Sequence, residues 1–197
     1  MRAALCLLLF ILGAAPAPAQ ELRASLDLAR ALAAKGRADR DPLALIVAAR
    51  LRRDASTSRR SEDPDARGLD TPRSLLAEAR RLARGERRIA SLADDVIATG
   101  EKGRARGPLH EIGRLAGGGR ETHAPIWFAG GRRAEIYVEA TRAVAVAVRA
   151  GDGTTLCAES NGGPVAYCWW TPTADDSVAV EIVNQGREPA TYRLVTN

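Results

Sequence analysis

Side chains that could carry out chemistry are scarce in this sequence. It holds two histidines, His110 and His123, and no Gly-x-Ser-x-Gly motif that would present a serine nucleophile. The histidines lie thirteen positions apart, in or beside a glycine-rich stretch, and no third ligand accompanies them to make a zinc site. A histidine in such a stretch is typical of a solvated side chain and not of a general base. We therefore expect no metal site.

Two further patterns fall short of an active site. The adjacent acids Asp94-Asp95 and Asp175-Asp176 would point apart on a helix or a turn, which favours solvation over acid–base catalysis. The triplet Gly117-Gly118-Gly119 is not followed by the Gly-Lys-Ser/Thr of a phosphate-binding loop. The sequence therefore predicts a protein that is not an enzyme and needs no cofactor. An unrecognised hydrolase is the weakest alternative.

The first residues indicate export. Met1-Arg2 is followed by an apolar run over residues 3–15, and Ala17-Pro18-Ala19 supplies a small-x-small cleavage pattern. The run is too short to span a bilayer comfortably, so we expect no transmembrane anchor. Cys6 precedes the end of the run, which argues against lipid attachment. The mature chain is expected to begin at Gln20 and to reside in the periplasm or outside the cell.

Removal of Cys6 would leave two cysteines in the mature chain. An even count in an exported protein predicts one disulfide, between Cys157 and Cys168. The intervening turn Asn161-Gly162-Gly163 would make the two strands antiparallel neighbours and bring the sulfur atoms together. A reactive or metal-binding pair is the alternative, disfavoured by the ten intervening residues and the lack of a nearby histidine.

Composition divides the mature chain in two. Residues 20–120 carry a net charge of +7 and residues 121–197 a net charge of −3, and no aromatic side chain occurs between positions 20 and 125. Such a break is typical of a boundary between independently built units. The expected divisions are a signal peptide (1–19), a helical domain (20–99), a Gly/Arg-rich linker (100–121) and a second domain (122–197).

The first unit has the pattern of a small helical bundle. Asp41-Pro42 and Thr71-Pro72 each place a capping side chain before a proline at the first helical position. Apolar residues at helical spacing follow both, and further helices are expected around residues 26–35, closing at Gly36, and 89–97. Residues 55–70 are nearly devoid of apolar side chains and are expected to form a mobile loop.

The second unit has the period-two pattern of strands. Apolar residues alternate over residues 134–140, 144–148 and 178–183, and glycine-containing turns separate these runs. About seven short strands in some 70 residues predict an antiparallel β-sandwich, jelly-roll-like, with one disulfide, in an α+β protein. Reduction of the disulfide is expected to unfold this sandwich and to spare the helices.

One resemblance concerns the last quarter to third of the chain. The matching features are a valine strand running into a glycine turn, two cysteines and a closing strand pair: Gly151-Asp152-Gly153, Leu156-Cys157, Cys168, Trp170-Thr171-Pro172, Val180-Glu181-Ile182-Val183-Asn184, Gly186, Tyr192-Arg193-Leu194 and Thr196-Asn197. From Val144 onward the chain resembles the bacterial pre-peptidase C-terminal domain, in particular its disulfide-bearing variant of small exported proteins.

That resemblance implies an accessory β-sandwich that aids secretion, surface attachment or binding and is not an enzyme. Many members carry two carboxylates on a strand associated with calcium. Ala143 and Ala145 stand at those positions here, and calcium requires several hard oxygen ligands. We therefore expect no calcium site.

The aromatic residues around Cys168 are the first candidates for binding. Neighbouring side chains on a strand point to opposite faces, so one ring of Trp169 and Trp170 is expected to pack beside the disulfide and the other to face solvent. The exposed ring could stack on a sugar or a partner protein. The alternative is that both rings are covered, one by the core and one by the helices. The possible binding residues are Trp169, Trp170 and Tyr167.

Arginines are the second candidates for binding. A cluster in the helical unit could contact an anionic surface: Arg80, Arg81, Arg84, Arg87 and Arg88. The alternative is a solvated helix face with interspersed acids. The helical unit has no aromatic side chain on which a nucleic-acid base could stack, and an exported protein rarely meets nucleic acid, so we do not expect that partner.

The leading hypothesis is an exported, non-enzymatic accessory or binding module of the cell envelope. Its β-sandwich would act on a protein or an envelope polysaccharide. In the alternative hypothesis, the protein is a structural interaction protein whose basic helical bundle docks on a partner or an anionic envelope surface.

Overall fold

The computed structural model describes residues 21–55, 66–98 and 109–197. The predicted signal peptide lies outside the described residues, as do residues 56–65 of the predicted loop, residue 99 of the helical domain and residues 100–108 of the predicted linker. No helix in the described ranges is long and apolar enough to cross a membrane.

Four helices make up the described part of the first unit: α1 (Glu21–Asp39), α2 (Pro42–Ala55), α3 (Pro72–Leu82) and α4 (Arg87–Ala98). The capping signals act as predicted. Asp41 accepts a hydrogen bond from the backbone N–H of Leu43 at 2.8 Å, and Thr71 forms a reciprocal capping box with Ser74. The apolar faces of the helices meet in one core around Leu45, Leu75 and Leu76, which confirms the helical bundle.

The first helix is longer than predicted. It continues through Gly36, where we expected it to close, and ends at Asp39. A Cβ atom on Gly36 would lie only 3.0 Å from the side chain of Leu45. Glycine at this position therefore allows α1 to approach α2 closely and does not end the helix.

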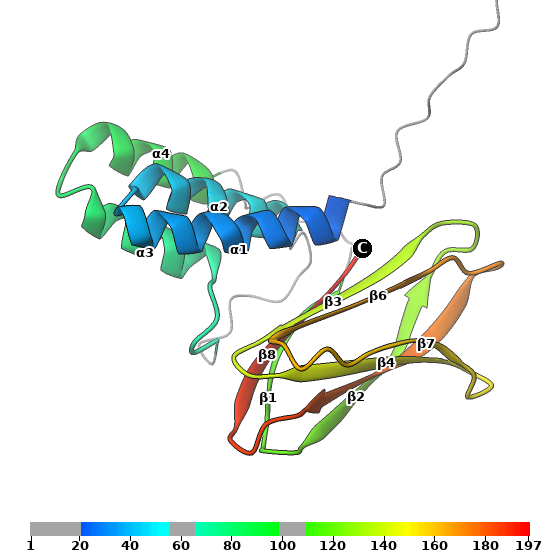
Figure 1. Cartoon of the computed structure of the whole chain (residues 1–197). Coiled ribbons are helices and arrows are strands. Elements are labelled where there is room, and N and C mark those ends of the chain that lie inside the picture. Colours follow the sequence, from blue (N-terminus) through cyan, green and yellow to red (C-terminus); the bar gives the residue numbers. More distant parts are fainter. Residues whose placement is uncertain (1–20, 56–65, 99–108) are drawn as a thin grey trace, which may run out of the picture.

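Eight strands follow in the described chain: β1 (His110–Leu115), β2 (Arg120–Phe128), β3 (Ala134–Ala140), β4 (Val144–Ala150), β5 (Thr155–Glu159), β6 (Val165–Trp170), β7 (Asp176–Asn184) and β8 (Ala190–Thr196). They form two antiparallel four-stranded sheets in the orders β1-β8-β3-β6 and β2-β7-β4-β5 (Figure 1). Most consecutive strands alternate between the sheets, as in a jelly roll. The predicted α+β fold with a C-terminal antiparallel β-sandwich is confirmed.

The sandwich begins earlier than its predicted start at residue 122. Strand β1 lies wholly inside the stretch 100–121, for which glycine content predicted a linker, and β2 begins there too. The glycine content has a packing reason at Gly113, where a Cβ atom would lie 2.4 Å from the Tyr192 hydroxyl oxygen. Glycine therefore allows a close approach of β1 to a tyrosine side chain, and the residue belongs to a strand.

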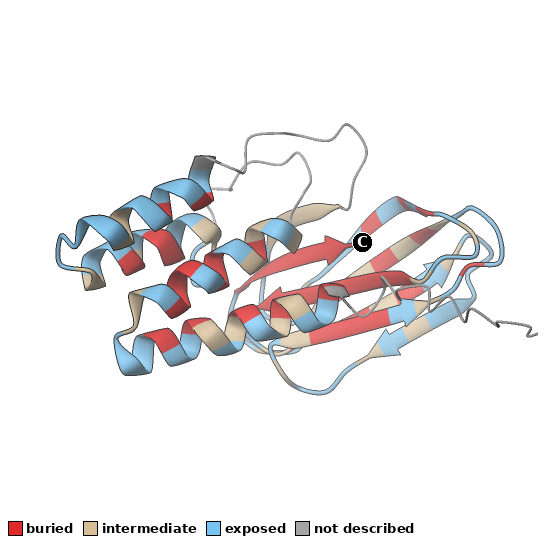
Figure 2. Ribbon diagram, turned by 90° about the horizontal axis from the view of Figure 1, so that it is seen from above, coloured by how far each residue is buried: buried red, intermediate tan, exposed pale blue. Residues whose placement is uncertain are grey.

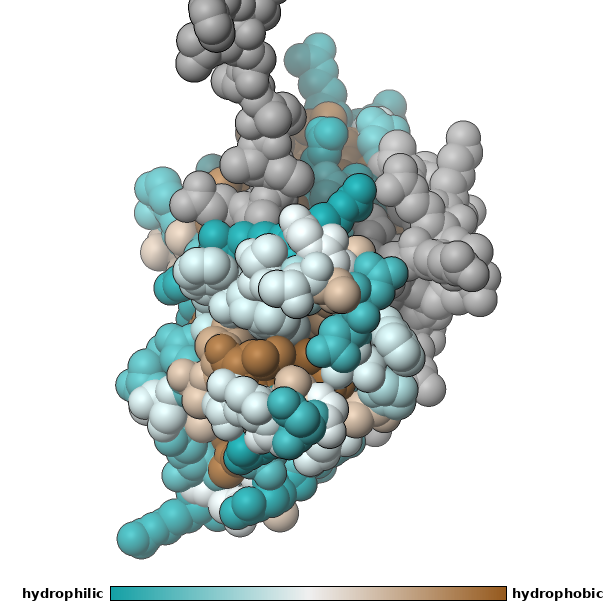
Figure 3. Space-filling view, turned by 90° about the vertical axis from the view of Figure 1, so that its right-hand side faces the viewer, coloured by the Kyte–Doolittle hydropathy of each residue, from teal (hydrophilic) through white to brown (hydrophobic). Residues whose placement is uncertain are grey.

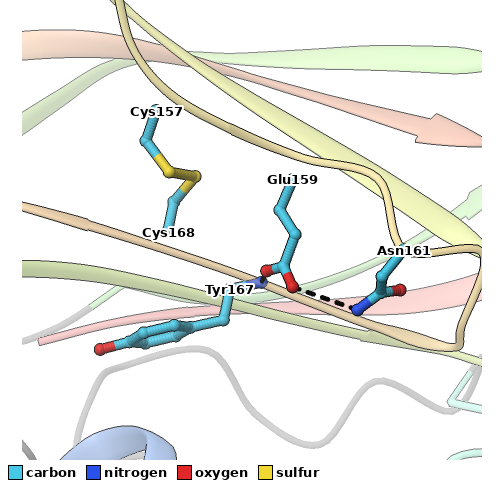
Figure 4. Close-up of a disulfide and its surroundings, with 5 residues drawn as sticks. All are labelled: Cys157, Glu159, Asn161, Tyr167 and Cys168. Atoms are coloured by element: carbon cyan, nitrogen blue, oxygen red, sulfur yellow. Dashed lines mark hydrogen bonds between the residues drawn. A yellow bond between two sulfur atoms is a disulfide. The ribbon is translucent and has the colours of Figure 1, made fainter.

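The disulfide joins Cys157 to Cys168, with Cα atoms 5.8 Å apart, as predicted. The expected arrangement of its strands is wrong. β5 pairs with β4, and β6 pairs with β3 in the opposite sheet, so the bond crosses from one sheet to the other at their open edge (Figure 4). The chain changes sheets at Asn161, whose side-chain oxygen accepts from the Gly163 N–H at 2.8 Å and whose amide donates to Glu159.

The helices cover the outer face of the sheet that contains β3. Buried residues colour both this strand and the facing sides of the helices (Figure 2). Leu22 and Leu26 of α1 pack against Tyr137, Tyr167 and Val195, and the Tyr137 hydroxyl donates a hydrogen bond to Asp27 at 2.9 Å. The two units therefore share an apolar interface.

A buried ion cluster lies in the same interface. The side chain of Arg52 is only 1% exposed, and its guanidinium makes two hydrogen bonds to the Glu139 carboxylate, at 2.6 and 3.0 Å. Arg193 of β8 and Arg30 of α1 each approach the same carboxylate at 3.4 Å. No role was expected for Arg52, which joins the helices to the sandwich.

Part of the predicted mobile loop belongs to this cluster. Arg193 donates a hydrogen bond to the Asp70 carbonyl at 2.8 Å, and Arg37 pairs with the Asp70 carboxylate at 2.5 Å. Burial opposes ionisation of Asp70, but the hydrogen bond and charge of Arg37 lower its pKa overall. Residues 66–70 are thus fixed against both units.

Removing the central carboxylate tests the interface. Glu139→Gln leaves buried arginines without their anion, and we expect the free energy of unfolding to fall by about 3–5 kcal/mol. Urea denaturation measures the loss. Glu181→Gln is the control, because Glu181 pairs with the exposed Arg120 at 3.8 Å and has no other ion pair among the described residues. This substitution should cost under about 1 kcal/mol. A Glu139→Gln variant as stable as the control would contradict the assigned role.

Candidate binding surface

Two turns meet at one end of the sandwich, where they join β2 to β3 and β6 to β7. The backbone N–H of Gly130 donates to Asp175 at 2.8 Å, and that of Gly131 donates to the Pro172 carbonyl, also at 2.8 Å. A Cβ atom on Gly130 would lie 2.5 Å from the Cα atom of Ala174, so glycine permits this close contact. The turns therefore form one fixed end, which we call the aromatic end for the residues Trp127, Trp169, Trp170 and Arg133.

Tryptophans of the aromatic end point in three directions. Trp127 lies on the outer face of β2 and is 71% exposed; Trp169 lies on the outer face of β6 and is 52% exposed. Trp170 points inward, and its ring meets that of Phe128 edge-on with centroids 5.0 Å apart. The alternation expected for Trp169 and Trp170 is therefore present, with Trp170 packed against the sandwich core. Seen from the right-hand side of Figure 1, the described surface is mainly hydrophilic, with a few small apolar patches (Figure 3).

Arg133 holds Trp169 in place. Its guanidinium lies over the Trp169 ring, 4.0 Å from the centroid, and donates a hydrogen bond to the Tyr167 hydroxyl at 3.2 Å. Its Nε atom is 3.2 Å from the fully buried carboxylate of Glu135. Burial raises the pKa of Glu135, while the Tyr167 hydroxyl and the charge of Arg133 oppose that rise. An exposed indole supported this way is preorganised for contact.

Tyr167 was predicted as a possible binding residue, but it is not available to a ligand. It is buried, Leu22 and Leu26 of α1 pack against it, and the Arg23 guanidinium lies 4.8 Å from its ring centroid. Sequence reasoning placed it beside the tryptophans, which is correct, but its outer face belongs to the interface with the helices. Tyr167 therefore supports Arg133 and does not itself form a binding surface.

Sequence reasoning missed Trp127 and Arg133. A signal for Trp127 was present, because Ile126 and Phe128 point into the core and the residue between them must point outward. No comparable signal marked Arg133, whose role depends on Trp169, Tyr167 and Glu135 from other places in the sheet.

Glu111, His123 and Tyr192 lie in a row, in the carboxylate–histidine–hydroxyl order of a catalytic triad. Glu111 approaches Nδ1 of His123 at 3.2 Å, and Nε2 of His123 lies 2.7 Å from the Tyr192 hydroxyl. Tyr192 is buried, however, and burial raises its pKa, with a hydrogen bond to Glu121 as a second cause. The row links β2 to β8 across the two sheets, at the edge opposite the disulfide.

Both histidines therefore differ from expectation. His123 is buried on β2, and His110 begins β1 with its Nε2 atom buried. Neither is a solvated linker side chain. Burial, and secondarily the charge of Arg193, lowers the pKa of His110 to about 4.

The outer face of the second sheet carries small side chains. Ala145 and Ala147 of β4, Ala158 of β5 and Ala179 of β7 alternate with core residues. The side chains of Ala143 and Ala145 carry no oxygen atom that could bind a cation. Across residues 21–55, 66–98 and 109–197, no group of three or more His, Cys, Asp or Glu side chains could hold a metal ion.

The predicted arginine cluster lies on the turn between α3 and α4 and the ends of those helices. Arg80 pairs with Asp94 across the two helices. The other four members are exposed, and none has an ion-pair partner within the described part of the chain: Arg81, Arg84, Arg87 and Arg88.

Comparisons with known proteins do not assign a family. No family model and no curated protein matches the chain. The crystal structure of the Yersinia pseudotuberculosis-derived mitogen covers 46% of this chain and 85% of its own length, at 14% identity and a TM-score of 0.34. A de novo designed double-stranded β-helix covers 45% of this chain and 99% of its own, at 12% identity and a TM-score of 0.30. These likenesses are too small to support an inference.

The half-buried His110 predicts a pH-dependent stability. Its folded pKa of about 4 lies below the usual 6.5, so the unfolded chain binds the proton more readily, and stability falls as the pH drops from about 6.5 toward 4. We expect a loss of about 1–2 kcal/mol between pH 7 and pH 5 in urea denaturation. His110→Gln should flatten that slope; an unchanged slope in the variant would contradict the assignment.

Proposed function

We propose that this protein is an exported, non-enzymatic binding module of the cell envelope that recognises a polysaccharide through its aromatic end. The observation that supports this most strongly is the exposed Trp169, whose ring is held by Arg133 on a rigid end of the sandwich. Exposed aromatic rings are enriched in surfaces that meet a partner, and Trp127 adds a second exposed ring on the opposite sheet at the same end.

The chemistry around Trp169 suits a sugar. An indole offers a flat apolar face to the C–H groups of a pyranose ring, and Arg133 beside it offers hydrogen-bond donors to hydroxyl groups. Binding sites commonly combine aromatic walls with a few fixed polar groups. Since Tyr167 and Glu135 already hold Arg133, little side-chain entropy would be lost on binding.

Export is the second part of the proposal. The N-terminal pattern of a signal peptide supports it, and a cross-sheet disulfide is compatible with an oxidising periplasm or extracellular space. The resemblance of residues 144–197 to the pre-peptidase C-terminal domain supports an accessory role in the same compartments. A protein partner at the aromatic end is the alternative occupant.

Substitution of the exposed indoles tests the binding surface. Chitohexaose is a suitable soluble probe, and purified peptidoglycan is the insoluble one. Trp169→Ala should weaken chitohexaose binding by about 2 kcal/mol or more, roughly 30-fold, as for truncation of a central anchor. Isothermal titration calorimetry measures the affinity, and cosedimentation measures retention by peptidoglycan.

Leu43→Ala is the matched control, because Leu43 is an exposed apolar residue on α2 and lies outside the sandwich. It should leave both measurements unchanged. Wild-type protein that binds neither probe, or a Trp127→Ala/Trp169→Ala double variant that binds both as the wild type does, would refute the polysaccharide proposal.

A further inference from the structure

Within the described helical part, the turn between α3 and α4 and the adjoining helix ends carry the largest group of arginines without an ion-pair partner. We call Arg81, Arg84, Arg87 and Arg88 the basic hairpin tip. All four are exposed, and none has an ion-pair partner in the described part of the chain. In Figure 1 this turn lies at the end of the helices farthest from the sandwich. The tip therefore projects away from the body of the molecule.

The positive charges of the basic hairpin tip are unfavourable at the N-terminus of α4. Arg87 and Arg88 are the first two residues of α4, and its first turn contains no acidic residue. The N-terminus of a helix is the positive end of its dipole and favours anions, so two cations there destabilise the isolated helix. Arg81 adds a third cation from the last turn of α3. The carboxylate of Glu86, directly before α4, offsets part of this charge, and an external anion would offset the rest.

The backbone of the turn is also unfavourable for arginine. Arg84 has a φ of 50°, in the left-handed region that glycine occupies readily and other residues rarely do. Gly85 beside it has a φ of 87°. The turn thus keeps an arginine where glycine would be more stable. An unfavourable backbone conformation that no local contact offsets is typical of a functional position.

An apolar side chain accompanies the tip. Leu92 lies four residues after Arg88, on the same side of α4, and is 46% exposed. A soluble polyanion has nothing to offer this side chain. A lipid bilayer with anionic headgroups offers both phosphates for the arginines and an apolar layer for the leucine.

We propose that the basic hairpin tip docks on the surface of a bilayer that contains anionic phospholipid. This inference is separate from the polysaccharide proposal, because it concerns the opposite end of the molecule. The arginines would neutralise headgroup phosphates, the α4 N-terminus would lie against the same anions, and Leu92 would reach the headgroup–acyl boundary.

Vesicle cosedimentation tests the docking surface. The probes are phosphatidylcholine vesicles with and without phosphatidylglycerol, and the sample is the full exported chain. Each arginine near such a surface is worth about fivefold in affinity, so Arg87→Gln/Arg88→Gln should weaken binding to the anionic vesicles about 25-fold. Added salt should weaken wild-type binding as well.

The control removes the same charge elsewhere. Arg114→Gln/Arg187→Gln replaces two exposed arginines on β1 and the β7–β8 turn and should bind anionic vesicles about as tightly as the wild type does. Thermal melting followed by circular dichroism verifies folding. Arg84→Gly should raise the melting midpoint because it relieves the left-handed backbone, and should still weaken vesicle binding.

Three outcomes would overturn the proposal. The first is equal binding to vesicles with and without phosphatidylglycerol. The second is equal loss in the tip variant and the control, which would mean that net charge alone acts. The third is tip-dependent binding to heparin with no binding to anionic vesicles, which would make the partner a polyanion and not a membrane.

Discussion

The structure depends on one buried carboxylate, that of Glu139. It lies between the helices and the sandwich and pairs with Arg52 at 2.6 Å, while Arg30 and Arg193 approach at 3.4 Å. A buried charge is tolerated only where opposite charges and hydrogen bonds surround it, so the three elements that supply the arginines must stay in register with β3. The helices and the sandwich therefore form one unit and not two tethered ones.

The two sheets of the sandwich are linked to each other at both open edges. The disulfide Cys157–Cys168 joins the sheets at the β5–β6 edge, and the contact between His123 and Tyr192 joins them at the β1–β2 edge. The aromatic end and the basic hairpin tip lie at opposite ends of the molecule (Figure 1). Together, the two proposals describe a protein that links a membrane surface to an envelope polymer.

Local signals in the sequence predicted local structure well. Asp41-Pro42 and Thr71-Pro72 marked two helix starts, and the alternating valines of β4 marked a strand, because each acts on its neighbours in the chain. The pairing of Arg52 with Glu139 spans 87 positions and leaves no local pattern, so Arg52 looked like any helix-end cation. β1 was missed because its glycine serves packing against Tyr192, a contact that composition cannot reveal.

Urea unfolding followed by two probes tests the central claim, that Glu139 joins the halves into one cooperative unit. All three tryptophans lie in the sandwich and all four described helices lie outside it, so emission and helical circular dichroism report on separate halves. The account predicts one shared midpoint, which reduction of the disulfide moves to lower urea for both probes. A shifted emission midpoint with the helical midpoint unmoved would contradict it.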